Sequence, residues 1–299
     1  MMDSPPKNSV TLRNVLREAV DMLSSNHIEQ AQLEAKLLLA YVLGLRKEDI
    51  IVYPDRELTD PQEEKFQQLV ERRCRKEPLA YIIGQREFWS LEFEVNSKVL
   101  IPRPETEGMI ERLLNLAGNK ADEKAIRILD VGTGSGVLAI VAALEFPKAQ
   151  VTAVDISDDA LEVARKNSLR HQVAERIEFL EMDLMRDWNL PANGFYDYIL
   201  SNPPYIPSKE LGLLMSDVRD YEPREALDGG SDGLDCYRCI VTNAFPYLKT
   251  GGYLIFEVGD EQAGPVKRSL QAHGGLDAIE IFQDLSGRDR IVSARRALG

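Results

Sequence analysis

The sequence predicts an α/β fold: a mostly parallel, doubly wound sheet that ends in a C-terminal antiparallel hairpin, preceded by a small all-helical N-terminal domain. Two patterns indicate this. From residue 125 onward, short apolar runs rich in β-branched residues alternate with helix-like segments, which is typical of a parallel sheet with both faces covered. Before residue 85, apolar residues recur instead at the three-and-four spacing of helices.

The N-terminal domain is predicted to span residues 1–84. Three segments carry helical spacing: 12–23, 34–45 and 61–74. Thr59 and Pro61 indicate the start of the third helix, because a threonine cap and a proline in the first turn both favour a helix N-terminus. Residues 45–58 are expected to form a connection.

A hairpin is predicted between the two domains, over residues 85–108. Residues 87–101 alternate apolar and polar side chains, and Asn96 and Ser97 are the expected turn. The stretch IPRPETE then ends the alternation and leads into a helix. The remaining residues, 109–299, form the second domain.

The second domain alternates strands with helices. Five strands are predicted over residues 126–131, 151–156, 176–182, 196–201 and 251–258. Helix-like segments over 137–146 and 159–170 separate the first three strands, so these should run parallel. The last two apolar runs, 278–284 and 289–294, are separated by only four residues and therefore predict an antiparallel hairpin.

Composition disfavours several kinds of protein. A formal net charge of −13 argues against a duplex nucleic-acid partner, whose phosphates need a basic surface. The three cysteines, Cys74, Cys236 and Cys239, make no disulfide framework, and their C-x-x-C lacks a second ligand pair, so no metal is expected. No apolar run approaches the roughly 20 residues of a membrane span, and no signal-peptide pattern opens the chain. We expect a reduced, soluble, cytoplasmic protein.

A glycine-rich turn follows the first strand of the second domain and precedes a helix. It consists of Gly132, Thr133, Gly134, Ser135 and Gly136. Glycines let the backbone turn tightly and approach a ligand, and the helix N-terminus that follows offers unpaired N–H groups. A dinucleotide fingerprint would need glycine where the chain has Val137, and a P-loop would need Gly-Lys-Ser/Thr. The turn is therefore predicted to bind a ligand other than a pyrophosphate.

Two acidic residues follow the next two strands at the same edge of the sheet. Asp155 can accept both ribose hydroxyls of a nucleoside, and Asp183 can accept from an exocyclic amine of adenine. Each also has a structural interpretation: Asp155 can cap the next helix, in competition with Ser157 and Asp158, and Asp183 can be a solvated loop acid. Together with the glycine turn they predict a nucleoside pocket that lacks a phosphate-clamping lysine and would suit a ligand carrying a sulfonium.

The stretch SNPPYIP at residues 201–207 ends the fourth strand, because proline cannot donate to a sheet ladder. Most loops with an Asn-Pro turn have no function beyond the turn itself. Here, however, the loop is rigid, polar and aromatic, and it follows a strand whose neighbours carry the predicted nucleoside pocket.

These features resemble the class I S-adenosylmethionine-dependent methyltransferases. The glycine turn, Asp155 and Asp183 are similar to the cofactor pocket of that class, and SNPPY is similar to a motif of enzymes that methylate a planar amide or amine nitrogen. Residues 78–107, 222–240 and 284–294 further resemble the bacterial release-factor glutamine methyltransferases. The helical N-terminal domain fits this family too, so the resemblance covers nearly the whole chain.

The resemblance implies methyl transfer from S-adenosyl-L-methionine to the side-chain amide nitrogen of the glutamine in the Gly-Gly-Gln motif of peptide-chain release factors, with S-adenosyl-L-homocysteine as product. The cofactor residues that it implies are Gly132, Thr133, Gly134, Ser135, Gly136, Asp155, Asp183, Leu184 and Asn202. The catalytic residues that it implies are Asn202, Pro203, Pro204 and Tyr205. The Asn202 side-chain oxygen and the Pro203 carbonyl can accept the two N–H groups of the target amide.

Other assignments stay open at this point. Some relatives have tryptophan directly after the acid that corresponds to Asp183, whereas here Leu184 follows and Trp188 comes later, so either side chain can pack on the adenine. Arg103, Glu105 and Glu257 either line the same rim or form structural ion pairs and caps. We expect the N-terminal domain to recognise the substrate, and the protein to be a monomer without a membrane or nucleic-acid partner.

Three other functions fit the sequence less well. A DNA-adenine or rRNA-guanine amine methyltransferase shares the NPPY motif, but the net charge of −13 argues against it. A cofactor-binding regulatory module would have no use for amide acceptors in the loop. A nicotinamide oxidoreductase is disfavoured by Val137.

Overall fold

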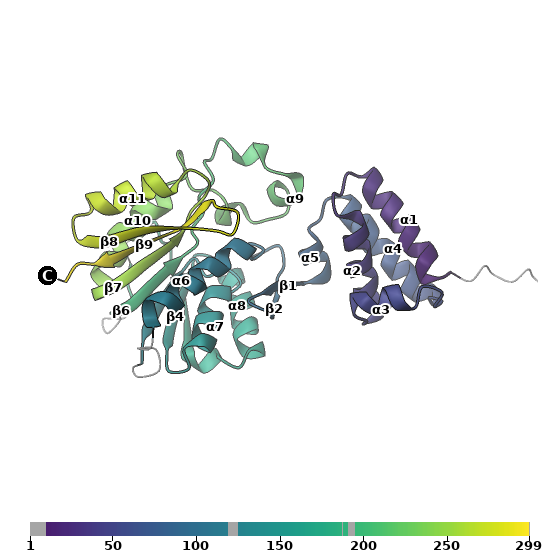
Figure 1. Cartoon of the computed structure of the whole chain (residues 1–299), viewed down its shortest axis with the longest axis horizontal. Helices are drawn as coiled ribbons and strands as arrows, with labels where there is room; N and C mark the ends of the chain where they lie inside the picture. Colours follow the sequence, from purple (N-terminus) through teal and green to yellow (C-terminus); the bar gives the residue numbers. More distant parts are fainter. Residues whose placement is uncertain (1–9, 119–124, 187, 191–194, 299) are drawn as a thin grey trace, which may run out of the picture. The chain divides into compact units, whose positions relative to one another are not determined.

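The structure is a computed structural model that describes residues 10–118, 125–186, 188–190 and 195–298. The described chain divides into two compact units (Figure 1). The first contains the residues up to Gly84 together with Ser216–Tyr221, and the second contains Gln85–Met215 and the residues from Glu222 onward. The division into a substrate-recognition domain, a hairpin linker and a methyltransferase domain stays a prediction.

The first unit is built from helices around one apolar core. Its described helices are α1 (Leu12–Ser25), α2 (Ala31–Leu43), α3 (Lys47–Val52), α4 (Asp60–Cys74), α5 (Leu79–Ile83) and α9 (Ser216–Arg219). Leu23, Leu39 and Phe66 from three of these helices are fully buried together. The three helices predicted from apolar spacing are therefore confirmed.

Local signals set where these helices start. Thr59 caps α4 as predicted, and its backbone N–H donates to the Gln62 side chain at 3.0 Å. The expected connection at residues 45–58 is wrong in part, because it contains α3. Asp49 accepts from the backbone N–H of Arg46 at 3.3 Å and stabilises the first turn of this helix. A helix of six residues is too short to show helical spacing, so the pattern missed it.

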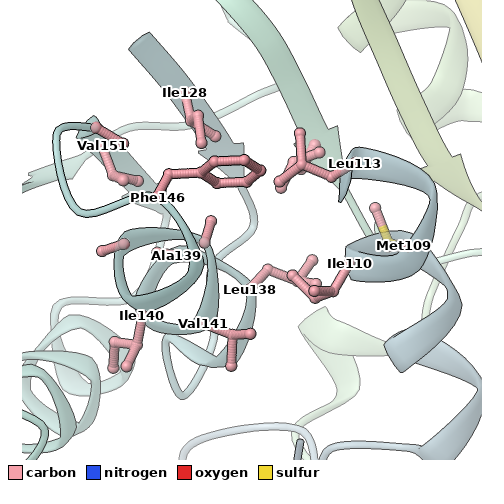
Figure 2. Packing of buried hydrophobic residues seen from close by; sticks show 14 of the residues in the cluster. Met109, Ile110, Leu113, Ile128, Leu138, Ala139, Ile140, Val141, Phe146 and Val151 are labelled. Carbon is pink, nitrogen blue, oxygen red and sulfur yellow. The ribbon is translucent and has the colours of Figure 1, made fainter. Parts of the chain in front are cut away.

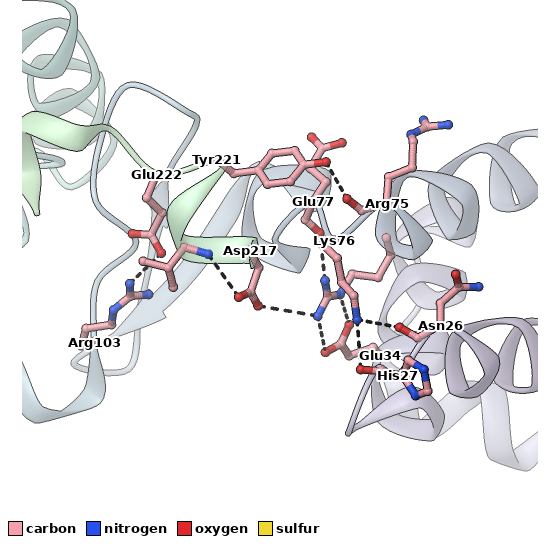
Figure 3. Close-up of polar contacts among 12 residues, drawn as sticks. Asn26, His27, Glu34, Arg75, Lys76, Glu77, Arg103, Asp217, Tyr221 and Glu222 are labelled. Carbon is pink, nitrogen blue, oxygen red and sulfur yellow. Dashed lines mark hydrogen bonds and ion pairs between the residues drawn. The ribbon is translucent and has the colours of Figure 1, made fainter. Parts of the chain in front are cut away.

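Polar contacts join α4 to its neighbours in the first unit (Figure 3). Arg73 of α4 is buried, and its guanidinium donates to Glu34 of α2 at 2.5 Å. Asp217 of α9 lies 4.0 Å from the same guanidinium. The Tyr221 hydroxyl donates to the carbonyl of Arg75 at 2.7 Å. Residues 216–221 are thus held in the first unit although they are far from it in sequence.

The second unit opens with the predicted hairpin, but its turn differs from the expected one. The hairpin consists of β1 (Gln85–Phe88) and β2 (Leu91–Glu94), paired antiparallel. The turn is formed by Trp89 and Ser90, with φ of 54° and 57°, and not by Asn96. Such two-residue turns usually contain Asn-Gly. Trp89 is held in place from outside the turn, because its backbone N–H donates to Glu107 at 2.8 Å and its indole N–H to Glu145 at 2.7 Å.

A seven-stranded sheet forms the centre of the second unit. Its strands are β3 (Arg127–Val131), β4 (Gln150–Asp155), β5 (Ile177–Glu181), β6 (Tyr196–Ser201), β7 (Leu248–Glu257), β8 (Leu276–Gln283) and β9 (Asp289–Arg296). The strand order is β5-β4-β3-β6-β7-β9-β8, with β9 antiparallel to both of its neighbours and the other pairings parallel. The predicted fold class, including the C-terminal antiparallel hairpin, is confirmed.

Helices cover both faces of this sheet (Figure 1). They are α6 (Glu107–Ala117), α7 (Val137–Glu145), α8 (Asp158–Arg170), α10 (Asp235–Ala244) and α11 (Ala263–Ala272). Successive residues of β3 point to opposite faces, so Ile128 enters the core formed with α6 and α7, and Leu129 enters the core formed with α10 and α11. Figure 2 shows Phe146 between Ile128 and Leu113 in the first of these cores.

Helix α7 is apolar on nearly every side because it is buried among its neighbours. It has only nine residues. Across the residues that the structure describes, no helix combines the length and the hydropathy needed to cross a membrane.

Candidate active site

Strand register brings the predicted site residues to one edge of the sheet. Val131 at the end of β3 pairs with Val154 of β4 and with Ser201 of β6. The residues that follow at or just beyond these positions are Gly132, Asp155 and Asn202. The strand order reverses at β3, and ligands of open α/β sheets bind outside the carboxyl ends of the strands at such a reversal. The fold therefore indicates a ligand site where the sequence predicts one.

The glycine turn is closely packed. Gly136 precedes α7 with a φ of 85°, which favours glycine, and a Cβ at this position would come within 3.0 Å of the Ala164 Cβ. The side chains of Thr133 and Ser135 are buried, and the Thr133 hydroxyl donates to Asp130 at 2.6 Å. These side chains therefore stabilise the turn from inside.

Asp155 holds the turn from the neighbouring strand. Its carboxylate accepts from the backbone N–H of Gly134 at 2.8 Å and of Ser157 at 3.0 Å. The helix cap of α8 is Ser157, whose hydroxyl accepts from the N–H of Ala160 at 3.2 Å. Burial raises the pKa of Asp155, although these N–H donors act in the opposite direction. Asp155 is thus free of a capping role and keeps lone pairs for a ligand.

Asp130 is a carboxyl next to the glycine turn that the sequence interpretation missed. It is fully buried in β3, and its Oδ2 accepts from Thr133 and from the N–H of Ala139 at 3.2 Å. Its Oδ1 finds no hydrogen-bond partner among the described residues. Burial raises the pKa of Asp130 to about 7. An acidic residue inside an apolar strand was the available signal, because carboxylates are rarely fully buried without a partner.

The loop after β5 brings Leu184, and not Trp188, to a cavity at this edge of the sheet. Leu184 lines this candidate cavity together with Gly132 and Asp155, among other residues. Trp188 is buried in the core shared with α10 and α11, and its indole N–H donates to the carbonyl of Leu184 at 3.2 Å. Asp183 pairs with Arg186 at 3.0 Å and is outside the described lining of the cavity.

The loop after β6 is fixed by a segment that is distant in sequence. The Ile206 N–H donates to the carbonyl of Leu227 at 3.0 Å, and its carbonyl accepts from the N–H of Gly229 at 2.9 Å. Gln262 donates to the carbonyl of Tyr205 at 2.8 Å. A Cβ at Gly229 would come within 2.7 Å of the Tyr205 Cα. The stretch EPREALDGG therefore forms a wall against which the NPPY loop lies.

A buried polar chain connects this loop to β7. The Asn202 amide Nδ2 donates to Thr106 Oγ1 at 3.3 Å, and the Thr106 hydroxyl donates to Glu257 Oε2 at 2.6 Å. Thr106 is 3% and Glu257 2% exposed, so Glu257 lies inside the protein and not on the rim. Burial raises the pKa of Glu257 to about 7 and that of Tyr205 to about 12.

Arg103 forms an ion pair with Glu222 at 2.6 Å (Figure 3). Glu222 is buried and also accepts from the backbone N–H of Ile101 at 3.2 Å. The stretch IPRPETE is thereby anchored to the stretch EPREALDGG, and Arg103 has the structural role that was one of its two interpretations.

One cavity at the strand edge contains many of the predicted residues. Those that line it are Gly132, Gly134, Asp155, Leu184, Asn202 and Pro204. Those outside its described lining are Thr133, Ser135, Gly136, Asp183, Pro203 and Tyr205. Leu100, Glu225 and Ala226 also line the cavity, and the sequence interpretation did not single them out. The sequence could have pointed to them, because they lie within residues 78–107 and 222–240, two of the stretches that carry the family resemblance.

Two family models match the chain. Residues 14–84 match the PrmC N-terminal domain, and residues 112–216 match a methyltransferase small domain. Curated relatives match over nearly the full length. A release factor glutamine methyltransferase of Geobacter sulfurreducens is 41% identical, covering 95% of this chain and 96% of its own. One of Moorella thermoacetica is 39% identical, covering 96% of this chain and 99% of its own.

Solved structures share the fold at low sequence identity. The hMettl16 catalytic domain in complex with MAT2A 3'UTR hairpin 6 is 16% identical, with a TM-score of 0.56 over 81% of this chain and 83% of its own. A human methyltransferase 10 domain containing protein is 17% identical, with a TM-score of 0.50 over 69% of this chain and 89% of its own. These likenesses show the fold alone. The identity to the curated relatives extends over both chains, and on that ground the chain belongs to the family of release factor glutamine methyltransferases.

Proposed function

We propose that this chain transfers a methyl group from S-adenosyl-L-methionine to the side-chain amide nitrogen of the glutamine in the Gly-Gly-Gln motif of a peptide-chain release factor. One observation carries the proposal: Asn202 of the NPPY loop lines the same cavity as Gly132, Gly134 and Asp155. The glycine turn that we assign to the cofactor and the loop that we assign to the target amide therefore line one cavity. The proposed enzyme is a monomer of the cytoplasm that acts on a protein and not on nucleic acid.

The residues of the cavity fit a nucleoside that carries a positive charge. Asp155 offers carboxylate oxygens to ribose hydroxyls, Leu184 offers an apolar surface to adenine, and Glu225 adds a second acidic side chain. Lys98 also lines the cavity, but its ammonium donates to Asp159 at 2.6 Å. S-adenosyl-L-methionine, when bound, supplies an electrophilic methyl group on its sulfonium. The acidic lining suits that cation better than it would suit a pyrophosphate.

The NPPY loop supplies acceptors for a planar NH₂ group. The Asn202 side-chain oxygen and the Pro203 carbonyl can each accept one N–H of the glutamine amide, and the proline rings add no competing N–H. Tyr205 can lie over the flat amide. An amide nitrogen is a poor nucleophile because its lone pair is delocalised into the carbonyl, so fixing it in line with the methyl group matters most. Such positioning can supply on the order of 7–11 kcal/mol of the barrier.

A labelling assay tests the proposal. Methyl-labelled S-adenosyl-L-methionine is incubated with this protein and a purified release factor, and label is expected in the release factor. A release factor whose Gly-Gly-Gln glutamine is replaced should stay unlabelled, because it lacks the target amide. Label in DNA or rRNA instead would contradict the proposal and would favour the amine methyltransferase that shares the NPPY motif.

The role of Asn202 is tested by a substitution. Asn202→Ala is expected to lose turnover by about 10²-fold, because one acceptor of the target amide is removed. Cofactor affinity, measured by calorimetry, should fall much less than turnover, although Asn202 lines the cavity. Asn243→Ala is a matched control, since it removes an amide on α10 that donates to the carbonyl of Arg186. An equal loss of cofactor affinity and turnover in Asn202→Ala would show that Asn202 serves the cofactor and not the glutamine.

A further inference from the structure

Two hydrogen bonds link Asn202 to Glu257 through Thr106. Their directions determine which end of the Asn202 amide faces the substrate. Thr106 has one hydroxyl hydrogen, and Glu257 Oε2 accepts it at 2.6 Å. Only lone pairs of Thr106 Oγ1 are then left for Asn202, whose Nδ2 lies 3.3 Å away. An ionised Glu257 carboxylate can only accept, so Thr106 must donate to Glu257 and Asn202 must donate to Thr106.

We propose that Thr106 and Glu257 are positioning residues for methyl transfer, because they orient the Asn202 amide so that its oxygen is presented to the target nitrogen. This inference rests on the proposed function in one respect, the role of Asn202 as the acceptor. A flipped Asn202 amide would present its own N–H groups to the substrate NH₂, and two donors facing each other form no hydrogen bond. Thr106 and Glu257 are themselves outside the described lining of the cavity.

The protonation state of Glu257 sets the direction of this hydrogen-bond chain. The charged and titratable groups that face Glu257 are Arg103, Glu105, Tyr205, Tyr237 and Arg290. Burial is the largest influence and raises the pKa of Glu257 to about 7, with Glu105 acting in the same direction and Arg290 and Arg103 against it. A protonated Glu257 can donate to Thr106, whose hydroxyl is then free to donate to the Asn202 oxygen. The flipped amide becomes stable, so turnover should fall as the pH drops below about 7.

Two substitutions of Thr106 separate a hydroxyl role from a packing role. Thr106→Val keeps the shape and removes the hydroxyl, whereas Thr106→Ser keeps the hydroxyl and removes a methyl group. We expect Thr106→Val to lower kcat by about 10-fold, less than Asn202→Ala because the Asn202 acceptor is still present, and Thr106→Ser to retain most of the wild-type rate, with cofactor affinity unchanged in both. A role in packing alone for this buried side chain predicts the opposite order, with the valine variant the more active. That order would overturn the proposal.

The pH profile and the Asn202 amide signal complete the test. Wild-type kcat should show an acidic limb with a midpoint near pH 7, and Glu257→Gln should lack this limb. In ¹⁵N NMR of the full chain, the Asn202 side-chain NH₂ should titrate with the same midpoint, and Thr106→Val should abolish that titration. The NMR measurement needs no release factor. Absence of labelling in the wild type would therefore refute the proposed function alone, whereas an Asn202 signal that ignores both pH and Thr106 would refute the positioning role.

Discussion

At the scale of single residues, Asp130 is a carboxylic acid fully buried in β3 with one oxygen that lacks a partner among the described residues. Burial raises its pKa from 3.8 to about 7. Below about pH 4 the folded and the unfolded chain both hold the proton. Between about pH 4 and 7 the unfolded chain has lost the proton while the folded chain keeps it, so stability falls as the pH rises, and above about 7 this loss is complete.

We therefore predict that the free energy of unfolding of the wild type falls more steeply between pH 5 and 7 than that of Asp130→Asn. The difference in slope should be on the order of 1.4 kcal/mol per pH unit, because one proton is involved. Urea denaturation at several pH values measures it, and ¹³C NMR of the carboxyl group measures the pKa directly. Parallel slopes, together with an Asp130 carboxyl that titrates near pH 4, would contradict the prediction.

The place of residues that directly follow a strand could be predicted from the sequence, while their roles stay predictions. Asp155 and Asn202 line the cavity because strand ends meet at one edge of a parallel sheet. Thr106 and Asp130 could not be assigned in this way, because their role depends on burial and on partners that are contacts of the folded chain. Leu184 was one of two open choices, and it lines the cavity while Trp188 is buried in the core.

At the scale of elements, the NPPY loop depends on its wall at Gly229. The φ of this glycine is not in the left-handed region, so a substitution there acts through steric overlap with its neighbours and not through backbone strain. The added Cβ of Gly229→Ala would lie 2.7 Å from the Tyr205 Cα and would force the Tyr205 backbone to move. We therefore predict that this variant lowers kcat/KM by about 10²-fold and costs about 1–3 kcal/mol of stability. Gly212→Ala is the matched control, since a Cβ there meets no atom within 4 Å. Equal activity of the two variants would show that the wall does not position the loop.

Elements with a regular period were predicted well, and elements fixed by outside contacts were not. The strands from β3 to β9 follow their apolar runs, and α7 and α8 follow their helical segments. The hairpin turn was misplaced because Trp89 and Ser90 lack the usual turn residues and depend on Glu107 and Glu145, which are distant in sequence. Helix α3 was missed because six residues are too few for a period to appear.

At the scale of the whole molecule, the alternation of strands and helices was enough to predict the parallel sheet, its position after the helical domain and its terminal hairpin. It could not show that residues 216–221 belong to the first unit, because that depends on contacts such as the one between Tyr221 and Arg75. Every residue that lines the candidate cavity belongs to the second unit. Stability of the first unit and cofactor binding by the second should therefore be separable.

The partly buried pair of Arg73 and Glu34 in the first unit tests this separation. We predict that Arg73→Met costs up to about 3–5 kcal/mol of stability, because the Glu34 side chain, which is only 15% exposed, loses its partner, while cofactor affinity below the unfolding transition stays at the wild-type value. Urea denaturation and calorimetry measure the two quantities. Arg72→Met is the matched control: its pair with Glu77 is more exposed and should contribute about 0–1 kcal/mol. Adding Glu34→Leu to Arg73→Met should recover most of the lost stability, since the unpaired charge is then gone. A loss of cofactor affinity in Arg73→Met while the protein is still folded would show that the two units do not act separately.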